Sequence, residues 1–243
     1  MGNIILKIDN LTKRYKDKVV LDHVSFEIEK GKIYGFIGEN GAGKTTTIRS
    51  ITGLTSIDEG SVELFGQSTS KGLEQARKKM GCLVERPILS LNETAFYNLK
   101  MQQILFGQND DEKINKLLER VGLGDVKNKK VKDFSLGMKQ RLGIAVSLIN
   151  NPELIILDEP VNGLDPMGMV EVRNLLKSLC AEDGITIIIS SHILAELYQL
   201  VTDYIIISHG KIIDTLSKQV LDEKKNERSL EEYYIELLGG NRR

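Results

Sequence analysis

The sequence predicts an α/β fold in which helices cover a mixed β-sheet and a helical subdomain is inserted into the core. Two observations lead to this prediction. Short runs of β-branched and other apolar residues alternate with segments of helical period, which indicates a parallel sheet covered by helices. Between about residues 86 and 150 the strand-like runs disappear and helical segments dominate. We therefore expect an α/β core over residues 1–85 and 151–215, a helical subdomain over 86–150 and a tail with a helix over 216–243.

The expected strands are short and apolar, and they cover residues 4–8, 24–28, 33–37, 61–64, 81–84, 154–157, 186–190, 204–207 and 211–214. The strands near the N-terminus follow one another too closely for helical crossovers, so we expect them to be antiparallel. A hairpin turn at Ser208-His209-Gly210 joins the last two strands, which are also expected to be antiparallel. The sheet should therefore combine parallel and antiparallel pairs.

The expected helices cover residues 44–52, 93–105, 112–121, 139–149, 169–179 and 230–238. In the helix over 169–179, for example, apolar residues recur at steps of three and four, at Val172, Leu175, Leu176 and Leu179. We expect this apolar stripe to pack on the sheet.

Composition limits the classes of function. The chain of 243 residues is 41% hydrophobic, enough to bury a large core. Its 33 basic and 34 acidic residues give a net charge of −1, so we expect no nucleic-acid partner. No apolar run approaches the ~18–20 residues of a membrane span. Cys82 and Cys180 lie far apart in apolar segments, where we expect buried thiols rather than a disulfide or a metal site.

A phosphate-binding loop follows the strand over 33–37 and opens the helix over 44–52. It matches the pattern G-x-x-x-x-G-K-[ST], and its expected nucleotide-binding residues are Gly38, Glu39, Asn40, Gly41, Ala42, Gly43, Lys44, Thr45 and Thr46. Glycines let backbone N–H groups surround the phosphates of ATP, and the helix N-terminus adds its positive end. Lys44 is expected to reach the β- and γ-phosphates as a catalytic cation, and the Thr45 hydroxyl to bind Mg²⁺. The core is therefore predicted to be that of a P-loop NTPase.

Two adjacent carboxylates, Asp158 and Glu159, end the strand over 154–157. A carboxylate at the C-terminal edge of a parallel sheet lies where ligands of such sheets bind, so Asp158 is expected to hold Mg²⁺. Glu159 is expected to polarise the attacking water as a catalytic residue. Taken without the phosphate loop, the same pair could be a helix cap or a surface acidic pair before a turn at Pro160.

The segment Phe134-Ser135-Leu136-Gly137-Met138-Lys139-Gln140-Arg141 carries no residue of ordinary catalytic chemistry, and Ser135 is a plausible N-cap for the helix that follows. In order, the phosphate loop, this segment and the Asp158-Glu159 strand resemble the ATP-binding subunits of ATP-binding-cassette (ABC) transporters over nearly the whole chain. The resemblance implies that Ser135 and Gly137 contact the γ-phosphate of ATP bound to a second subunit. The segment departs from the family's Leu-Ser-Gly-Gly-Gln at Phe134, Leu136 and Met138.

The resemblance implies three further roles. Tyr15, in the polar segment Lys13-Arg14-Tyr15-Lys16, matches the residue that stacks on adenine, although it could also be an ordinary exposed tyrosine. His192, at the end of the strand over 186–190, matches the catalytic switch histidine that contacts the γ-phosphate, and its alternative is a structural histidine. Asp165 matches a contact to the partner subunit, and its alternative is a turn closed by Pro166.

Among the departures from the family's motifs, Glu85 best indicates the subgroup. Where the family has a glutamine after the strand over 81–84, this chain has a glutamate that is expected to join Thr45 and Asp158 at the metal. With the segment over 134–141 and Glu159-Pro160-Val161-Asn162-Gly163-Leu164-Asp165-Pro166, this substitution resembles the bacitracin-resistance and lantibiotic-immunity exporters.

The resemblance implies an ATP-binding and ATP-hydrolysing subunit, with ATP and Mg²⁺, that drives transport through a separate membrane permease. Export of an antimicrobial peptide or a related compound, and hence antibiotic resistance, is the expected process. The expected partners are the permease and a second cassette, either an identical or a related chain, and the expected location is cytoplasmic, on the inner face of the cell membrane through the permease. Two alternatives are a soluble ABC ATPase acting on nucleic acid or the ribosome and a phosphate-loop kinase with a small acceptor.

Overall fold

The strands form two sheets. The computed structural model describes residues 3–85, 87–192, 194–225 and 228–239. A three-stranded antiparallel sheet has the order β2 (Lys18–Glu29), β1 (Ile4–Tyr15) and β4 (Glu59–Leu64). A six-stranded sheet has the order β5 (Met80–Leu83), β6 (Leu154–Asp158), β7 (Thr186–Ser191), β3 (Ile33–Ile37), β8 (Asp203–Ser208) and β9 (Lys211–Ser217). Its neighbouring strands are parallel except for the antiparallel pair of β8 and β9.

The central strands are buried on both faces, and their sequences are correspondingly apolar throughout. Every residue of β3, β6, β7 and β8 is buried, as expected for a parallel sheet that is covered on both sides. Alternate residues enter two different hydrophobic clusters. Ile155 and Leu157 face one cluster, while Leu154 and Ile156 face the other, which also contains the inward side chains of the three-stranded sheet.

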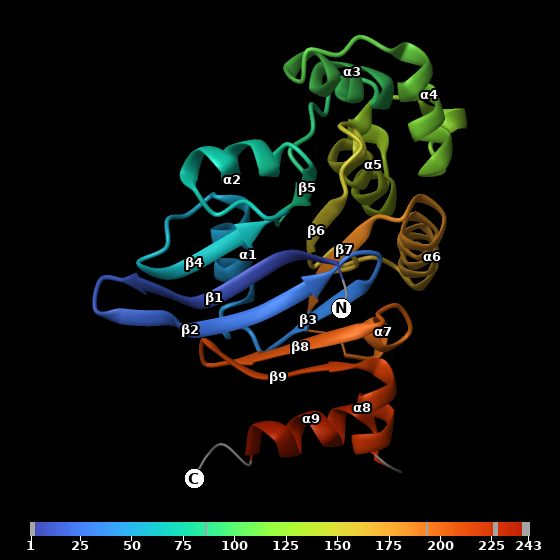
Figure 1. Ribbon diagram of the computed structural model, residues 1–243. Coiled ribbons are helices and arrows are strands. Elements are labelled where there is room, and N and C mark those ends of the chain that lie inside the picture. The colour runs from blue at the N-terminus through green and yellow to red at the C-terminus, as the bar shows by residue number, and fades with distance from the viewer. Residues whose placement is uncertain (1–2, 86, 193, 226–227, 240–243) are drawn as a thin grey trace.

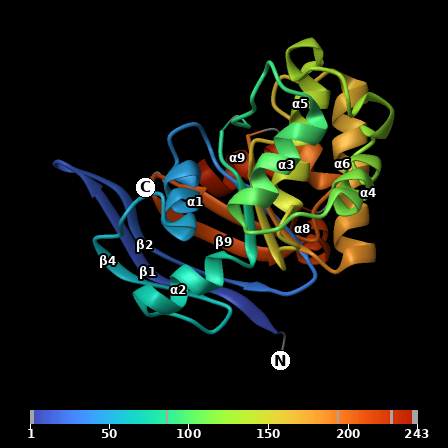
Figure 2. The same cartoon turned by 90° about the horizontal axis from the view of Figure 1, so that it is seen from above.

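The helices divide between these two clusters, and Figure 1 shows where each helix lies. The bounds are α1 Lys44–Thr52, α2 Ser70–Arg77, α3 Ala95–Leu105, α4 Asp111–Arg120, α5 Leu136–Leu148, α6 Pro166–Asp183, α7 Leu194–Tyr198, α8 Lys218–Lys225 and α9 Leu230–Gly239. Helices α1 and α2 contribute to the cluster beneath the three-stranded sheet, and α3 to α9 contribute to the other. Figure 2 shows α3 to α6 grouped on the side of the molecule away from the three-stranded sheet.

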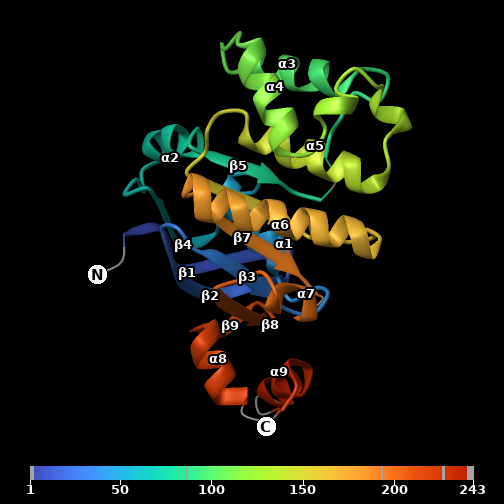
Figure 3. The ribbon, with the colours of Figure 1, turned by 90° about the vertical axis from the view of Figure 1, so that its right-hand side faces the viewer.

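Residues 87–150 contain three α-helices and two short 3₁₀ helices, Gly124–Val126 and Val131–Asp133, and no strand among the described residues. The division into core, subdomain and tail stays a prediction, and residue 86, its expected boundary, lies outside the described residues. Leu99, Ile114 and Leu142 from this segment pack in the same cluster as Ile155 of the sheet, so the hydrophobic core is continuous across that boundary. At the opposite end of the molecule, α8 and α9 lie beside β9 (Figure 3).

The predicted fold class is confirmed, and each expected strand and helix has a counterpart in the structure. Helices α2, α7 and α8 are additional. Among the described residues, no helix combines the length and the apolar character that a membrane span needs. The expectation of two buried thiols is wrong: Cys82 is exposed and Cys180 is partly exposed. Cys82 lies on β5 at the edge of the sheet, where one face of the strand is left open.

Candidate functional site

The phosphate loop joins β3 to α1 through a backbone that only glycine fits at two places. A methyl group on Gly38 would lie 2.6 Å from the carbonyl oxygen of Ile207, so the loop passes directly against β8. Gly43 has a φ of 113°, and a methyl group added to it would lie 2.7 Å from the Leu21 side chain. The Gly210 N–H donates to the carbonyl oxygen of Ala42 over 2.9 Å. The loop is therefore held against its neighbours before any ligand binds.

Lys44 lies inside this loop and is only 6% exposed. Its ammonium donates to the carbonyl oxygens of Gly38 and Glu39, at 2.7 and 3.2 Å. Burial lowers the pKa of Lys44 from its ordinary value of 10.5, and the carboxylates of Glu159 and Asp158 oppose this shift. A cation held by neutral carbonyl groups in a loop of backbone N–H groups suits an anionic ligand such as a triphosphate.

The rest of the loop has graded exposure. Ala42 is buried, and its N–H donates to the Glu39 carbonyl oxygen over 3.0 Å. Glu39, Asn40 and Gly41 are exposed, while Thr46 is half-buried in the first turn of α1. The exposed side of the loop is thus the side on which a nucleotide can enter.

The hydroxyl of Thr45 hydrogen-bonds the carboxylate of Asp158 at the end of β6. Thr45 Oγ1 donates to Asp158 Oδ2 over 2.9 Å, and the Ser190 hydroxyl donates to Asp158 Oδ1. The parallel register pairs Asp158 of β6 with Ser190 of β7, which brings these groups together. Oxygen donors of this kind suit Mg²⁺, which proteins usually hold through one or two carboxylates together with substrate phosphates.

Glu159 follows directly and has a left-handed backbone conformation, with a φ of 51°. Its N–H donates to Ser190, and its side chain contacts two others: His192 Nδ1 lies 2.9 Å from Oε1, and Asn162 Nδ2 donates to Oε2 over 3.0 Å. A non-glycine residue in this conformation is uncommon and is often found where function requires a particular side-chain direction. Both oxygens of the carboxylate are therefore oriented by neighbouring side chains.

A cavity of about 710 Å³ opens beside these groups. It is lined by Thr45, Glu85, Pro87, Leu89, Leu91, Leu136, Lys139, Gln140, Asp158, Glu159, Asn162 and Gly163. Glu85 lines it with a φ of 65° and forms an ion pair with Arg49 of α1. The structure thus brings Glu85 to the cavity of the proposed metal ligands but pairs its carboxylate with Arg49, and its role at the metal stays a prediction.

Tyr15 lies at the end of β1 and is 46% exposed. Its hydroxyl is 3.4 Å from that of Thr55. Tyr15 pairs with Lys18 at the start of β2, and β2 carries the Leu21 side chain that contacts Gly43. Tyr15 is thereby linked to the phosphate loop through one antiparallel strand pair. Its stacking on adenine stays a prediction.

Ser135 and Gly137 begin helix α5. The Ser135 hydroxyl accepts from the Met138 N–H over 3.2 Å, which confirms the predicted N-cap. Neither residue lines the 710 Å³ cavity, although Leu136 between them does. Ser135 hydrogen-bonds within its own helix, and Gly137 lies beside Gly168 and Leu164, so the contact of both residues with a γ-phosphate stays a prediction.

Two side chains in this site were not assigned to it from the sequence. The sequence places Ser190 only in the strand over 186–190, whereas in the structure its hydroxyl donates to Asp158. The sequence places Asn162 only in the loop that ends at Asp165, whereas in the structure its side chain donates to Glu159. The available signal was a polar residue at the end of the strand over 186–190 and another in the turn after the strand over 154–157. Asp165 itself caps α6, accepting from the Gly168 N–H over 2.7 Å, and its contact with a partner subunit stays a prediction.

Comparisons with known proteins agree on one family. The ABC transporter family model matches residues 21–162. The bacitracin transport ATP-binding protein BcrA of Bacillus licheniformis is 46% identical over 227 residues, 93% of this chain and 74% of that protein. The lantibiotic transport ATP-binding protein SrtF of Streptococcus pyogenes is 47% identical over 209 residues, 86% of this chain and 89% of that protein.

Solved structures give the same result. The ATP-binding subunit of an ABC transporter superposes with a TM-score of 0.84 at 29% identity, covering 96% of this chain and 99% of the other. A dimeric post-hydrolysis state of the ATP-binding cassette MJ0796, bound to ADP and Pi, has a TM-score of 0.78 at 26% identity, covering 88% of this chain and 99% of the other.

Proposed function

We propose that this chain, which belongs to the ABC transporter family and is an ATP-binding subunit with ATPase activity, drives export of an antimicrobial peptide or a related compound through a separate membrane permease. The observation that carries the proposal is the convergence of Lys44, Thr45, Asp158 and Glu159 at one edge of the sheet. The similarity to proteins named for bacitracin and lantibiotic transport supports the class of cargo.

In the proposed site, the phosphates of ATP take the place of the carbonyl oxygens that Lys44 now contacts. Thr45 and Asp158 would hold Mg²⁺, with Glu85 as a further ligand if it leaves Arg49. When bound, the ion would neutralise charge that develops on the phosphates. The chain's own contribution is to present oxygen donors and a lysine in fixed positions.

Glu159 is proposed to orient and polarise the attacking water. His192 and Asn162 hold its two carboxylate oxygens, so the side chain keeps one direction without a ligand. His192 is proposed to contact the γ-phosphate from the same side. General-base assistance of this kind contributes about 10²–10⁴ to the rate.

A second cassette is proposed to complete the site. Ser135 and Gly137 stand at the N-terminus of α5, where unpaired N–H groups and the helix dipole favour an anion. Their place outside the chain's own cavity fits a contact with ATP bound to a partner. ATP would then join two chains, and hydrolysis would release them.

The permease is proposed to dock beside the edge strand β5. A groove of about 240 Å³ there is lined mainly by apolar side chains, among them Leu83, Ile88 and Leu89. Ile88 is 97% exposed, and Leu105 on α3 is 78% exposed. Exposed apolar side chains around a groove are typical of a protein interface. This contact would hold the chain at the inner face of the cell membrane.

Light scattering of Glu159→Gln, with and without MgATP, tests the proposal. We expect ATP hydrolysis to fall by ~10²–10⁴ and the unhydrolysed ATP to convert monomer into dimer. A variant that binds ATP and stays monomeric would contradict the model of two identical chains. Co-purification with a membrane protein tests the permease separately.

A further inference from the structure

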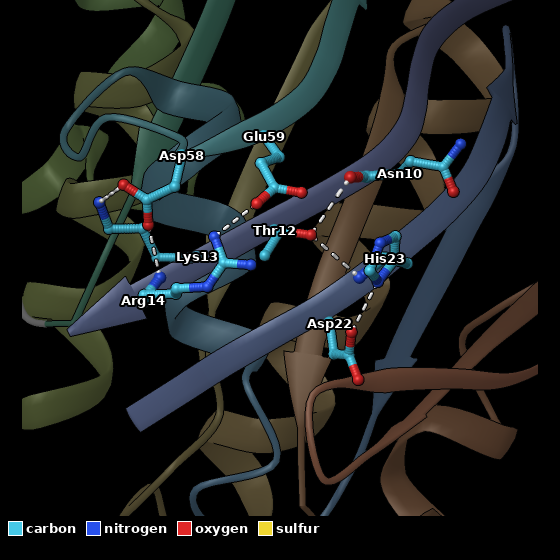
Figure 4. A network of polar contacts seen from close by, with 8 residues as sticks. All are labelled: Asn10, Thr12, Lys13, Arg14, Asp22, His23, Asp58 and Glu59. Atoms are coloured by element: carbon cyan, nitrogen blue, oxygen red, sulfur yellow. Dashed lines mark hydrogen bonds and ion pairs between the residues drawn. The ribbon is translucent and has the colours of Figure 1, made fainter. Parts of the chain in front are cut away.

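Lys13 is a cation that the fold buries near the proposed base-binding end of the nucleotide site. It is 6% exposed, and its Nζ lies 3.3 Å from Asp58 Oδ1 and 3.4 Å from the Ser56 hydroxyl. The same ammonium lies over the ring of Tyr15, 5.4 Å from the ring centroid. Figure 4 shows Lys13 and Asp58 directed toward each other.

The adjacent ion pair provides a contrast. Arg14 NH1 lies 2.6 Å from Glu59 Oε1, but these side chains are 43% and 52% exposed (Figure 4). An exposed pair contributes little to stability. A buried ammonium is unfavourable unless a counter-charge and hydrogen bonds compensate it, so the Lys13–Asp58 pair is the one whose geometry the fold has to maintain.

Asp58 is itself fixed in place. Its Oδ2 accepts from the Arg14 N–H over 2.5 Å, and its own N–H donates to the Thr12 carbonyl oxygen over 3.0 Å. The hydrogen bond from the Arg14 N–H, and to a smaller extent the one from Lys13, holds the pKa of the Asp58 carboxyl below its usual 3.8. The carboxylate is therefore charged at neutral pH and bound to the β1 backbone as well as to Lys13.

This pair connects the end of β1 to the exit of the phosphate-loop helix. Ser56 and Asp58 lie in the segment that leaves α1, and the Thr55 N–H there donates to the Arg49 carbonyl oxygen over 3.1 Å. On the other side, Lys13 of β1 pairs with Leu21 of β2, which contacts the phosphate loop. Two separate connections thus fix Tyr15 relative to that loop.

We propose that Lys13 and Asp58 are positioning residues that hold Tyr15 at a set distance from the phosphate loop and direct one face of its ring to a nucleobase. The inference rests on the proposed role of Tyr15 in ATP binding. A base and a triphosphate are joined covalently, so their two subsites must keep one separation, and a preformed arrangement avoids an ordering cost on binding. The ammonium over one ring face leaves the opposite face for stacking.

The test compares ATP with inorganic tripolyphosphate, which has the phosphates without the base. Dissociation constants are measured for Lys13→Met, Asp58→Asn, the double variant and Tyr15→Ala, with Arg14→Gln as the matched control. Lys13→Met, Asp58→Asn and Tyr15→Ala should weaken ATP binding by about five- to tenfold, the scale of one stacking contact. Tripolyphosphate binding should stay within about twofold, and Arg14→Gln should change neither.

Other outcomes distinguish the positioning role of Lys13 and Asp58 from the base-binding role of Tyr15. If Tyr15→Ala weakens ATP binding while Lys13→Met and Asp58→Asn do not, the positioning role is wrong and the proposed function stands. If Tyr15→Ala also has no effect, the base-binding role of Tyr15 is wrong. Equal loss of ATP and tripolyphosphate binding indicates general damage and overturns the positioning role. The double variant removes both charges, so it keeps the test valid if either single variant unfolds, which circular dichroism monitors.

Discussion

The phosphate loop and the start of helix α5 are both glycine-containing junctions that end in a helix N-terminus. The phosphate loop packs against other parts of its own chain: Gly38 and Gly43 lie against β8 and β2, and Lys44 is buried inside the loop. At the start of α5, by contrast, Leu136 is 51% exposed, and a methyl group on Gly137 would lie 3.9 Å from the Gly168 Cα atom, an ordinary contact distance.

This difference indicates how the site divides between two surfaces. One junction uses its glycines to fit against its own chain, whereas the other leaves the same kind of anion-binding end open. Both have unpaired N–H groups at a helix N-terminus, but the cation of the first, Lys44, is buried, whereas Lys139 in the first turn of α5 is partly exposed. The difference fits the proposal that the two junctions are halves of one site and belong to different chains.

Lys44→Ala should have the largest effect on the phosphate-loop half. The variant removes the cation that faces the phosphates, and hydrogen bonds to charged groups contribute up to about 3 kcal/mol each, so ATP affinity should fall about 100-fold. Isothermal titration calorimetry measures it, with the melting temperature as a control for folding. Unchanged affinity would show that the loop does not bind the phosphates.

The same substitution at the two junctions tests the comparison directly. Gly38→Ala would place a methyl group 2.6 Å from the Ile207 carbonyl oxygen, so the protein should lose about 1–3 kcal/mol of stability. Gly137→Ala has space within its own chain and should leave the melting temperature and ATP binding of the monomer unchanged. It should nevertheless reduce ATP-dependent dimerisation in the Glu159→Gln background. Dimerisation as strong as that of Glu159→Gln alone would contradict the assignment of α5 to the partner's ATP.

The two halves should also differ in their response to pH. Burial lowers the pKa of Lys44, so its charge is lost at a lower pH than that of an exposed lysine, whereas residues 135–138 carry no titratable side chain. Bound phosphates favour the charged form of Lys44. ATP affinity should therefore fall as the pH rises above the pKa that Lys44 has in the ATP-free protein, by up to about tenfold per pH unit. Titrations between neutral and alkaline pH measure it, with circular dichroism confirming that the protein stays folded. Constant affinity would mean that Lys44 keeps its charge throughout this range.

The sequence predicted those parts of the molecule that depend on local pattern. Continuous apolar runs predicted β3, β6, β7 and β8, and the glycine spacing predicted the phosphate loop. Helices α2, α7 and α8 were missed because α7 has five residues and the other two each bury only one, so no apolar period could develop.

The contacts between distant segments could not be predicted. Ser190 meets Asp158 because β6 and β7 are neighbours in parallel register, and a strand order cannot be read from the strands themselves. The pairing of Lys13 with Asp58 depends in the same way on how β1 approaches the segment after α1. The residue types of the candidate site were therefore predictable, while the hydrogen bonds that orient them were not.

Glu85→Gln should have the smallest effect on ATP hydrolysis. The variant tests whether the phosphate-loop half of the site includes Glu85. Glu85 pairs with Arg49, and both side chains are substantially exposed, at 61% and 43%. Exposed pairs contribute at most about 1 kcal/mol, so the neutral variant should keep ATP hydrolysis within about fivefold. The same assay on Arg49→Gln is the matched control, because it breaks the pair and leaves the carboxylate in place. If Glu85→Gln abolishes hydrolysis while Arg49→Gln does not, the carboxylate itself takes part in the chemistry, and the phosphate-loop half of the site extends across the cavity to β5.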